Sequence, residues 1–244
     1  MSRKVLITAP LKQEVEVFRA YQNALDHLII PKGVEVGRHY IVNDCPQVIP
    51  YIKGTYEEIN TGDYYGKTSD THIWRPNNLS KMPRLRNASI KASKGYDYWF
   101  SIDTDLVLEP ETLEALLDAD KDVVSEVFWT EGTWWCNAWM YDQCDPADQL
   151  ERWKAPGLYQ VGGTGALTLV KTKVFEKADY TPIPCIKNAL WGEDRWFSIR
   201  CACHGIEMWL DTHCPATHLY TDKIFKNWRL THDYSRGNIS EQER

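Results

Sequence analysis

The sequence lacks several features that would point to particular classes of protein. Its seven cysteines form no Cys-x-x-Cys pair, and their number is odd, so neither a zinc site nor a disulfide framework is indicated. No apolar run has the length of a signal peptide core or a membrane span, and the opening MSRKVLITAP leads directly into a strand-like segment. Internal repeats and low-complexity tracts are also missing. We therefore expect reduced cysteines, no membrane span and a cytoplasmic location.

An excess of positive charge is missing as well. The 28 Lys and Arg residues are outnumbered by 34 Asp and Glu residues, which gives a formal net charge of −6. The chain as a whole is therefore not a polybasic nucleic-acid binder, although this does not exclude a local basic patch. The 244 residues, 43% of them hydrophobic, suit one large globular domain. The 11 Trp and 13 Tyr residues indicate either a large aromatic core or a surface on which sugar rings stack.

Apolar periodicity predicts alternating strands and helices. The predicted strands cover residues 4–9, 34–42, 98–102, 123–128 and 206–210, with another from about 166. The predicted helices cover residues 15–28, 84–94, 110–117 and 194–203. Residues 52–81 and 129–159 show no clear period, and the segment after 220 is polar and charged. The alternation favours an α/β fold with a mostly parallel, twisted sheet and helices on both faces.

Two carboxylates interrupt the apolar stretch YWFSIDTDLVLE. Asp103 and Asp105 follow the predicted strand 98–102 and, being two residues apart in extended chain, point to the same side. Buried carboxylates are costly without a partner, and ligands of open α/β sheets sit at the carboxyl ends of strands. A hard divalent ion such as Mg²⁺ or Mn²⁺ together with substrate phosphates would be such a partner. The alternatives are a solvated turn or a helix N-cap.

The surrounding block resembles a known family. RNASIKASKGYDYWFSIDTDLVLEPETLEALL is similar to the central segment of GT-A fold glycosyltransferases, especially the family-2-like ones. The segments VLITAP, IVNDCP, GGTGALTLVKTKVF and WGEDRWF resemble further family motifs and occur in the family order over about residues 1–220. The positions that match in the central block are Arg86, Asn87, Gly95, Tyr98, Asp103 and Asp105.

The resemblance implies a single GT-A-like, Rossmann-type catalytic domain over residues 1–220. Its nucleotide-sugar-binding half would be 1–105 and its acceptor-binding half 106–220, followed by a C-terminal tail, 221–244. It implies metal-dependent transfer of a sugar from a UDP- or GDP-sugar to a hydroxyl acceptor, with inversion. The implied nucleotide-sugar contacts are Thr8, Ala9, Pro10, Asp44, Arg86, Asp103 and Thr104. The implied ligands of Mn²⁺ or Mg²⁺ are Asp103, Asp105 and His218, with His218 preferred to His213.

The acidic pair Glu193-Asp194 opens a predicted helix. One interpretation is structural, because a helix dipole stabilises acidic residues at its N-terminus. The other is catalytic, since direct transfer with inversion needs one carboxylate to take the proton of the acceptor hydroxyl. The resemblance assigns this general base to Asp194 and a supporting role to Glu193.

The Trp-rich segment 129–153 is the expected acceptor side. The resemblance implies acceptor or sugar contacts from Trp129, Trp134, Trp135, Gly163 and Trp191, and the alternative is a hydrophobic wall. The acceptor itself stays open among a glycan, a protein, a small molecule and a modified base in DNA. The basic residues of the tail suit either a cover over a diphosphate, a contact to a phosphate-bearing acceptor or a solvated end.

The sequence also departs from the family pattern. The second strand ends in Asn43-Asp44 instead of two Asp residues, Thr104 stands within the Asp-x-Asp motif, and a Gln-Arg-Arg-Trp element is absent, which argues against a processive polysaccharide synthase. Two other classes remain as alternatives. A sugar-nucleotide nucleotidylyltransferase is disfavoured because TAPLKQE has no glycine-rich phosphate loop, and a non-catalytic sugar-binding module would explain the tryptophans but not the ordered acidic motifs.

Overall fold

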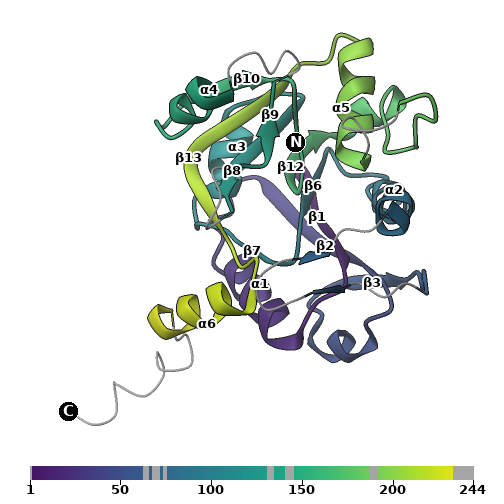
Figure 1. Cartoon of the computed structure of the whole chain (residues 1–244), viewed down its shortest axis with the longest axis vertical. Helices are drawn as coiled ribbons and strands as arrows, with labels where there is room; N and C mark the ends of the chain where they lie inside the picture. The colour runs from purple at the N-terminus through teal and green to yellow at the C-terminus, as the bar shows by residue number, and fades with distance from the viewer. Residues whose placement is uncertain are drawn as a thin grey trace.

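The chain forms a nine-stranded mixed sheet with helices on both faces (Figure 1). The computed structural model describes residues 2–62, 66–67, 72–73, 76–130, 135–140, 146–186 and 192–232. The strands are β1 (Arg3–Leu11), β2 (Val34–Val42), β3 (Thr55–Glu58), β4 (Gly66–Lys67), β5 (His72–Ile73), β6 (Tyr98–Ile102), β7 (Leu106–Val107), β8 (Val123–Trp129), β9 (Ala138–Trp139), β10 (Leu158–Val161), β11 (Gly163–Thr164), β12 (Leu167–Lys171) and β13 (Met208–His218). The helices are α1 (Val15–Asp26), α2 (Pro76–Ala92), α3 (Thr112–Asp118), α4 (Pro146–Arg152), α5 (Glu193–Cys203) and α6 (Asp222–Thr231), with 3₁₀ turns η1 (Pro46–Tyr51) and η2 (Thr172–Glu176).

The direction of the strands decides where the functional site can lie. The strand order is β10-β13-β8-β12-β6-β1-β2-β3, and β7 pairs with β13 outside this path. β3, β2, β1 and β6 run parallel; β12 is antiparallel to both β6 and β8, so β8 and its parallel neighbour β13 share the direction of β6. Six strands therefore end at one edge of the sheet, where ligands of open α/β sheets bind.

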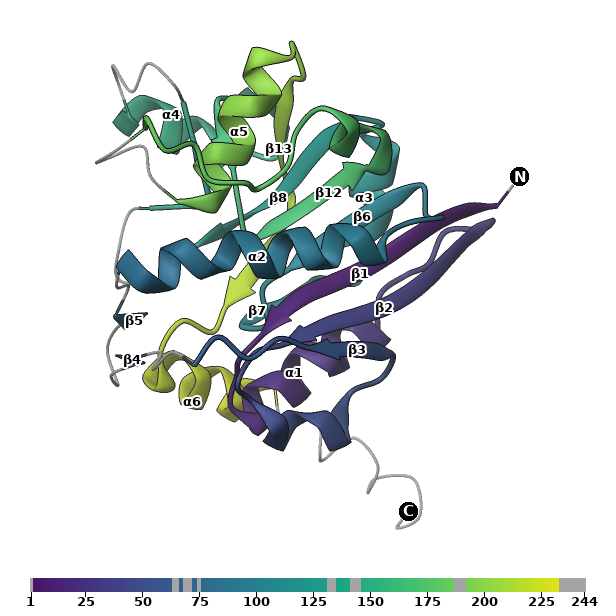
Figure 2. The same ribbon diagram turned by 90° about the vertical axis from the view of Figure 1, so that its right-hand side faces the viewer.

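Alternating side chains of the buried strands form one core on each face of the sheet. In β6, Tyr98, Phe100 and Ile102 join the cluster that α1 and α3 cover, whereas Trp99 joins the cluster that α5 covers. α2 lies across the same face as Trp99, over β1 and β6, and α1 lies on the opposite face (Figure 2). β6 is almost wholly apolar because its side chains are buried on both faces of the sheet.

The predicted fold class is confirmed, and most predicted elements are present with shifted ends. β1 continues through Pro10 to Leu11, because the chain keeps its parallel register with β2 beyond the proline. α2 begins at Pro76 and not at residue 84, and Pro83 lies inside it. A proline inside a helix removes one backbone hydrogen bond, and α2 nevertheless continues through Pro83. Residues 55–58, predicted as part of a loop, form β3.

β13 is longer than the predicted strand. The prediction ended at Leu210, but the strand continues to His218 after a break in its register with β8 between Asp211 and Ala216. Pro215 in this interval is typical of a bulge and not of a regular strand, which explains why periodicity alone missed the second half.

The predicted C-terminal tail begins with a docked helix. Residues 222–231 form α6, whose N-cap is Thr221, with Oγ1 accepting a hydrogen bond from the backbone N–H of Ile224 at 3.2 Å. Trp228 packs with Val17 and Ala24 of α1 in a small cluster that also contains Val107 and Leu219. This first part of the tail is therefore not a solvated end, and residues 233–244 lie outside the described residues. None of the helices in the described part of the chain is long and apolar enough to cross a membrane.

We expect Trp228→Ala to destabilise the protein by about 3 kcal/mol, because truncating a buried tryptophan removes apolar burial and leaves a cavity. Leu230→Ala in the same helix is the matched control, since Leu230 is 83% exposed whereas Trp228 is 9% exposed. The measurement is the free energy of unfolding in urea. Equal losses in the two variants would contradict the docking of α6.

Candidate active site

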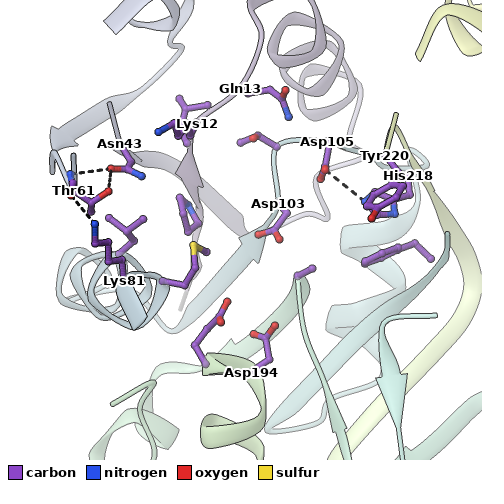
Figure 3. A pocket seen from close by; sticks show the side chains of 18 of the residues that line it. Lys12, Gln13, Asn43, Thr61, Lys81, Asp103, Asp105, Asp194, His218 and Tyr220 are labelled. Carbon is purple, nitrogen blue, oxygen red and sulfur yellow. Dashed lines mark hydrogen bonds and ion pairs between the residues drawn. The ribbon is translucent and has the colours of Figure 1, made fainter. Parts of the chain in front are cut away.

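A pocket of about 370 Å³ opens at the carboxyl edge of the sheet (Figure 3). Its walls come from the segments that follow β1, β2, β6, β8 and β13, together with α2 and the N-terminus of α5. Seven predicted site residues line it, namely Pro10, Asp103, Thr104, Asp105, Glu193, Asp194 and His218. The parallel strand ends thus bring together residues that are more than 200 positions apart in the sequence.

Asp103 is held by a buried arginine. Arg86, on α2, is 2% exposed, and its Nη2 donates to Asp103 Oδ1 at 2.7 Å while Nη1 donates to Ser101 Oγ at 2.6 Å. Its Nε lies 3.9 Å from Oε1 of Glu193. Burial raises the pKa of Asp103 above its usual range, and Arg86 opposes that rise. Arg86 is therefore the cation that compensates the acidic residues on this wall.

Asp105 faces His218. β7 follows Asp105 directly and pairs with β13, with Leu106 opposite His218, so the short strand sets the two side chains side by side. His218 Nε2 lies 3.5 Å from Asp105 Oδ2, and its Nδ1 lies 3.2 Å from Thr130 Oγ1. Figure 3 shows this pair on the opposite side of Asp103 from Lys81. An imidazole and a carboxylate that are both partly exposed are suitable ligands for a divalent transition metal ion.

Glu193 and Asp194 form the wall at the first turn of α5. Asp194 packs against Gly165 so closely that a Cβ at residue 165 would lie 2.2 Å from Asp194 Oδ2. Burial and the neighbouring Glu193 carboxylate raise the pKa of Asp194 well above its usual range. Burial likewise raises the pKa of Glu193, against the influence of Arg86. The pair is therefore more than a solvated helix N-terminus, because its carboxylates lie in a pocket beside Asp103.

Polar and cationic residues that the sequence analysis did not select line the remaining side. Asn43 Oδ1 accepts hydrogen bonds from the N–H and hydroxyl of Thr61, at 3.2 and 2.9 Å. Lys81 Nζ donates to the carbonyl of Thr61 at 2.8 Å. Lys12 follows β1 and lines the pocket on the side of Asn43 (Figure 3). Two lysines at one pocket provide the positive charge that a phosphate group requires.

Several residues predicted to contact the nucleotide-sugar lie elsewhere. Thr8 and Ala9 are fully buried inside β1 and do not line the pocket. Asp44 accepts hydrogen bonds from Thr61 and Gly62 through Oδ2, at 3.1 and 2.9 Å, so it closes a turn. Arg86 lies behind the pocket and holds Asp103, so its geometry does not support the expected contact with a base. Thr8 and Ala9 lie too early in β1, just before the pocket residue Pro10, whereas Asp44 and Arg86 are already paired with other residues.

The predicted aromatic contacts are likewise not gathered at this pocket. Trp129 is half-buried and packs against the core cluster that contains Trp99 and that α5 covers, and Trp135 is 55% exposed. Gly163 lies against Trp139 and Ser198, with no space for a side chain. Trp134 and Trp191 lie outside the described residues. Among the described residues, the phenyl and phenol rings that line the pocket are those of Phe128 and Tyr220, which were not predicted from the sequence.

The predicted set of three metal ligands is not assembled. Among the described residues, no three His, Cys, Asp or Glu side chains stand together in a way that could hold a metal ion. The reason is the orientation of Asp103, whose Oδ1 is turned to Arg86, while Asp105 and His218 face one another. Two of the three predicted ligands are therefore adjacent and the third is engaged by an arginine.

Some of the missed residues had a signal in the sequence. Lys12 stands directly after the first strand and Asn43 directly after the second, and residues that follow parallel strands share one edge. Thr61 and Lys81 had none, because they fall in a segment that shows no periodicity.

The fold is similar to that of solved glycosyltransferases. The structure of GalNAc-T7 with UDP, GalNAc and Mn²⁺ matches over 90% of this chain and 44% of its own, with a TM-score of 0.58 and 11% identity. The mannosyltransferase PcManGT from Pyrobaculum calidifontis, in complex with GDP-Man and Mn²⁺, matches over 94% of this chain and 61% of its own, with a TM-score of 0.54 and 12% identity. A197 from STIV matches over 88% and 85% of the two chains, with a TM-score of 0.46 and 14% identity.

No protein-family model and no curated protein sequence matches the chain. This chain spans less than half of the GalNAc-T7 structure and about three fifths of the mannosyltransferase. At these identities the likeness shows the fold alone. The α/β fold with its large mixed, mostly parallel sheet resembles the GT-A glycosyltransferase fold, as the sequence predicts.

We expect Arg86→Met to destabilise the protein by about 3–5 kcal/mol at pH 8, because breaking a buried ion pair leaves carboxylates uncompensated. The loss should be smaller at pH 5, where Asp103, Glu193 and Asp194 bind protons more readily owing to their raised pKa values. Urea unfolding at the two pH values measures this, and Arg19→Met at an exposed arginine is the control. A loss that does not depend on pH would show that Arg86 stabilises the protein by packing alone.

Proposed function

We propose that this protein is a metal-dependent glycosyltransferase that moves a sugar from a nucleoside diphosphate sugar to a hydroxyl acceptor. The observation that carries the proposal is the pocket at the carboxyl edge of the sheet. It combines an Asp105–His218 pair, a partly buried carboxylate at Asp194 and two lysines within one cavity of about 370 Å³. Structures with the similar fold bind UDP or GDP-mannose together with Mn²⁺, which supports the same ligand class here.

The lysines favour a diphosphate as part of the substrate. Lys12 and Lys81 stand on the side of the pocket formed by β1, β2 and α2, near Asn43 and Thr61. The amide of Asn43 and the hydroxyl of Thr61 supply hydrogen-bonding groups of the kind that recognise a base or a ribose. This side of the pocket is therefore the proposed donor side.

Asp105 and His218 are the proposed ligands of Mn²⁺ or Mg²⁺. Their oxygen and imidazole nitrogen atoms fit such an ion, and substrate phosphates and water would complete its coordination. Bound there, the ion would neutralise charge that develops on the departing diphosphate. Asp103 contributes a negative potential beside this pair, with its orientation fixed by Arg86.

Asp194 is the proposed general base. A base takes a proton from a hydroxyl more effectively when its pKa is raised toward the working pH. Burial and the charge of Glu193 have that effect on the pKa of Asp194. The acceptor hydroxyl would enter between Asp194 and the sugar and transfer its proton to the Asp194 carboxylate. As its oxygen bonds to the anomeric carbon with inversion, the bond from that carbon to the diphosphate breaks and nucleoside diphosphate leaves.

We expect one class of nucleotide-sugar to stabilise the protein in the presence of Mn²⁺. A ligand at a hundredfold its dissociation constant adds about 2.7 kcal/mol to the stability of the folded state. The measurement is a thermal-shift panel of UDP-, GDP-, TDP- and CDP-sugars, each with Mn²⁺ or with EDTA. Asp105→Ala should lose the metal-dependent shift, and Asp118→Ala, at an exposed aspartate of α3, should keep it. The donor site would be refuted if no nucleotide-sugar shifted the wild type.

Asp194→Asn should separate binding from chemistry. The variant keeps the size of the side chain and loses the base, so we expect donor binding to persist while turnover falls by about 10²–10⁴-fold. Release of nucleoside diphosphate in the presence of an acceptor panel measures the turnover, with Asp118→Asn as the control. A wild type that binds sugars and releases no nucleoside diphosphate with any acceptor would point to a sugar-binding module.

A further inference from the structure

Two carboxyl groups lie opposite one another on the neighbouring strands β8 and β13, and neither of them lines the pocket. Glu126 of β8 pairs in register with Asp211 of β13. Glu126 is 0% exposed and Asp211 is 3% exposed. Buried carboxyl groups are rare without a cation beside them, so this pair needs a physical explanation.

The pair stands at the start of a bulge in β13. Between the pairs Asp211↔Glu126 and Ala216↔Phe128, β13 has four residues where β8 has only Val127. The carboxyl groups hold this bulge by accepting hydrogen bonds from its backbone. Glu126 Oε1 accepts from the N–H of Cys214 at 3.3 Å, and Asp211 Oδ1 accepts from the N–H of His213 at 2.8 Å.

The bulge decides how β13 enters the pocket. Directly after it, Ala216 and Thr217 pair with Phe128 and Trp129, and His218 follows. The rings of Phe128 and His218 are 4.7 Å apart, and both residues line the pocket. A change in the path of residues 212–215 would therefore move His218 relative to Asp105.

The surroundings of Glu126 favour its neutral form. Its Oε2 is buried and has no hydrogen-bond partner, which is far more costly for a carboxylate than for a carboxylic acid. Burial, followed by the charge of Asp211, raises the pKa of Glu126 to about 9. The titratable groups that face this pair are His213 and Cys214 on the bulge, with Glu109 and Glu111 near Cys214, while the neighbouring strands place Leu158 opposite Asp211 and Thr168 opposite Ser125.

We propose that Glu126 is a proton-linked positioning residue, which in its neutral form closes the bulge of β13 against β8 and thereby fixes the place of His218 in the pocket. Ionisation would put a second charge beside Asp211. The bulge could relieve this only by opening toward water, and it faces solvent at His213, whose side chain is 52% exposed. The role of His218 as a ligand rests on the proposed function, whereas the closure of the bulge does not.

The sign of the pH effect follows from linkage. In the unfolded chain the Glu126 carboxyl has its ordinary pKa of 4.5, and in the folded chain its pKa is about 9. Between these values the folded state holds a proton that the unfolded state has released. The stability that this group contributes is therefore fully present below pH 4.5, the pKa in the unfolded chain. It is lost as the pH rises toward 9, and the folding equilibrium constant falls by up to about tenfold per pH unit.

Glu126→Gln tests the proposal because glutamine is a neutral side chain of the same shape that cannot ionise. We expect the folding equilibrium constant of the wild type to fall relative to that of E126Q by about tenfold or more between pH 6 and pH 9, measured by urea unfolding. Hydrogen exchange of the backbone amides of residues 212–214 and 216–218, corrected for intrinsic rates, should likewise lose protection with rising pH only in the wild type. Glu35→Gln, at an exposed glutamate in β2, should behave as the wild type.

Parallel pH profiles for wild type and E126Q in both measurements would overturn the proposal. Should E126Q fail to fold, carbon-13 NMR of the glutamate carboxyl groups in the wild type decides the matter. One glutamate that titrates above pH 7, and at a lower pH in Asp211→Asn, supports the proposal, and a protein in which all glutamates titrate below pH 6 refutes it. If the bulge responds as expected but no nucleotide-sugar binds at any pH, the positioning of residue 218 stands and the proposed function fails.

Discussion

The ion pair between Arg86 and Asp103 is the interaction on which the pocket depends. Three carboxyl groups, those of Asp103, Glu193 and Asp194, lie together in a place where each would be costly alone. The guanidinium is itself almost fully buried, so water screens its attraction to these carboxyl groups only weakly. It also donates a hydrogen bond to Ser101 Oγ. This single side chain ties α2 to β6 and approaches α5, which is why three elements distant in sequence meet at one wall.

The direction of the strands supplies the other part of the geometry. A parallel strand can deliver its next residue only to the carboxyl edge, so Lys12, Asn43, Asp103 and Thr130 reach one cavity from four separate strands. β12 runs the opposite way and therefore brings the residue before it, Ala166, to the same edge, where its carbonyl accepts a hydrogen bond from the N–H of Asp103 at 2.8 Å. The site is thus largely a consequence of topology, and its chemistry follows from which residues occupy these ends.

Topology also explains what could be predicted from the sequence. The strand 98–102 was predicted with its observed ends because continuous burial leaves a clear apolar run. The strand 34–42 was predicted with its observed ends because turn residues follow its last apolar residues. Asp103 and Asp105 could be selected because acidic residues next to such a run are unusual. Asp194 could be selected because it forms an acidic pair with Glu193 at the start of a predicted helix, in a segment that resembles a family motif. The side-chain directions of Arg86 and Asp44 were not predictable, since they depend on partners far away in sequence, Asp103 and Thr61. The second half of β13 and the docking of α6 depend on tertiary contacts in the same way.

The acidic residues at the pocket and the pair Glu126 and Asp211 show how carboxyl groups take different roles in this protein. The carboxylates at the pocket lie beside Arg86, and Lys12 and Lys81 stand across the cavity, so the site can hold charge and change it during a reaction. Glu126 and Asp211 are more deeply buried than Asp103 and Asp194. No Lys or Arg side chain is among the partners described for them, and a proton on Glu126 takes the place of a cation. Compensation by arginine persists at any physiological pH, whereas compensation by a proton does not. The first arrangement therefore suits catalysis, and the second makes the path of β13 into the pocket sensitive to pH.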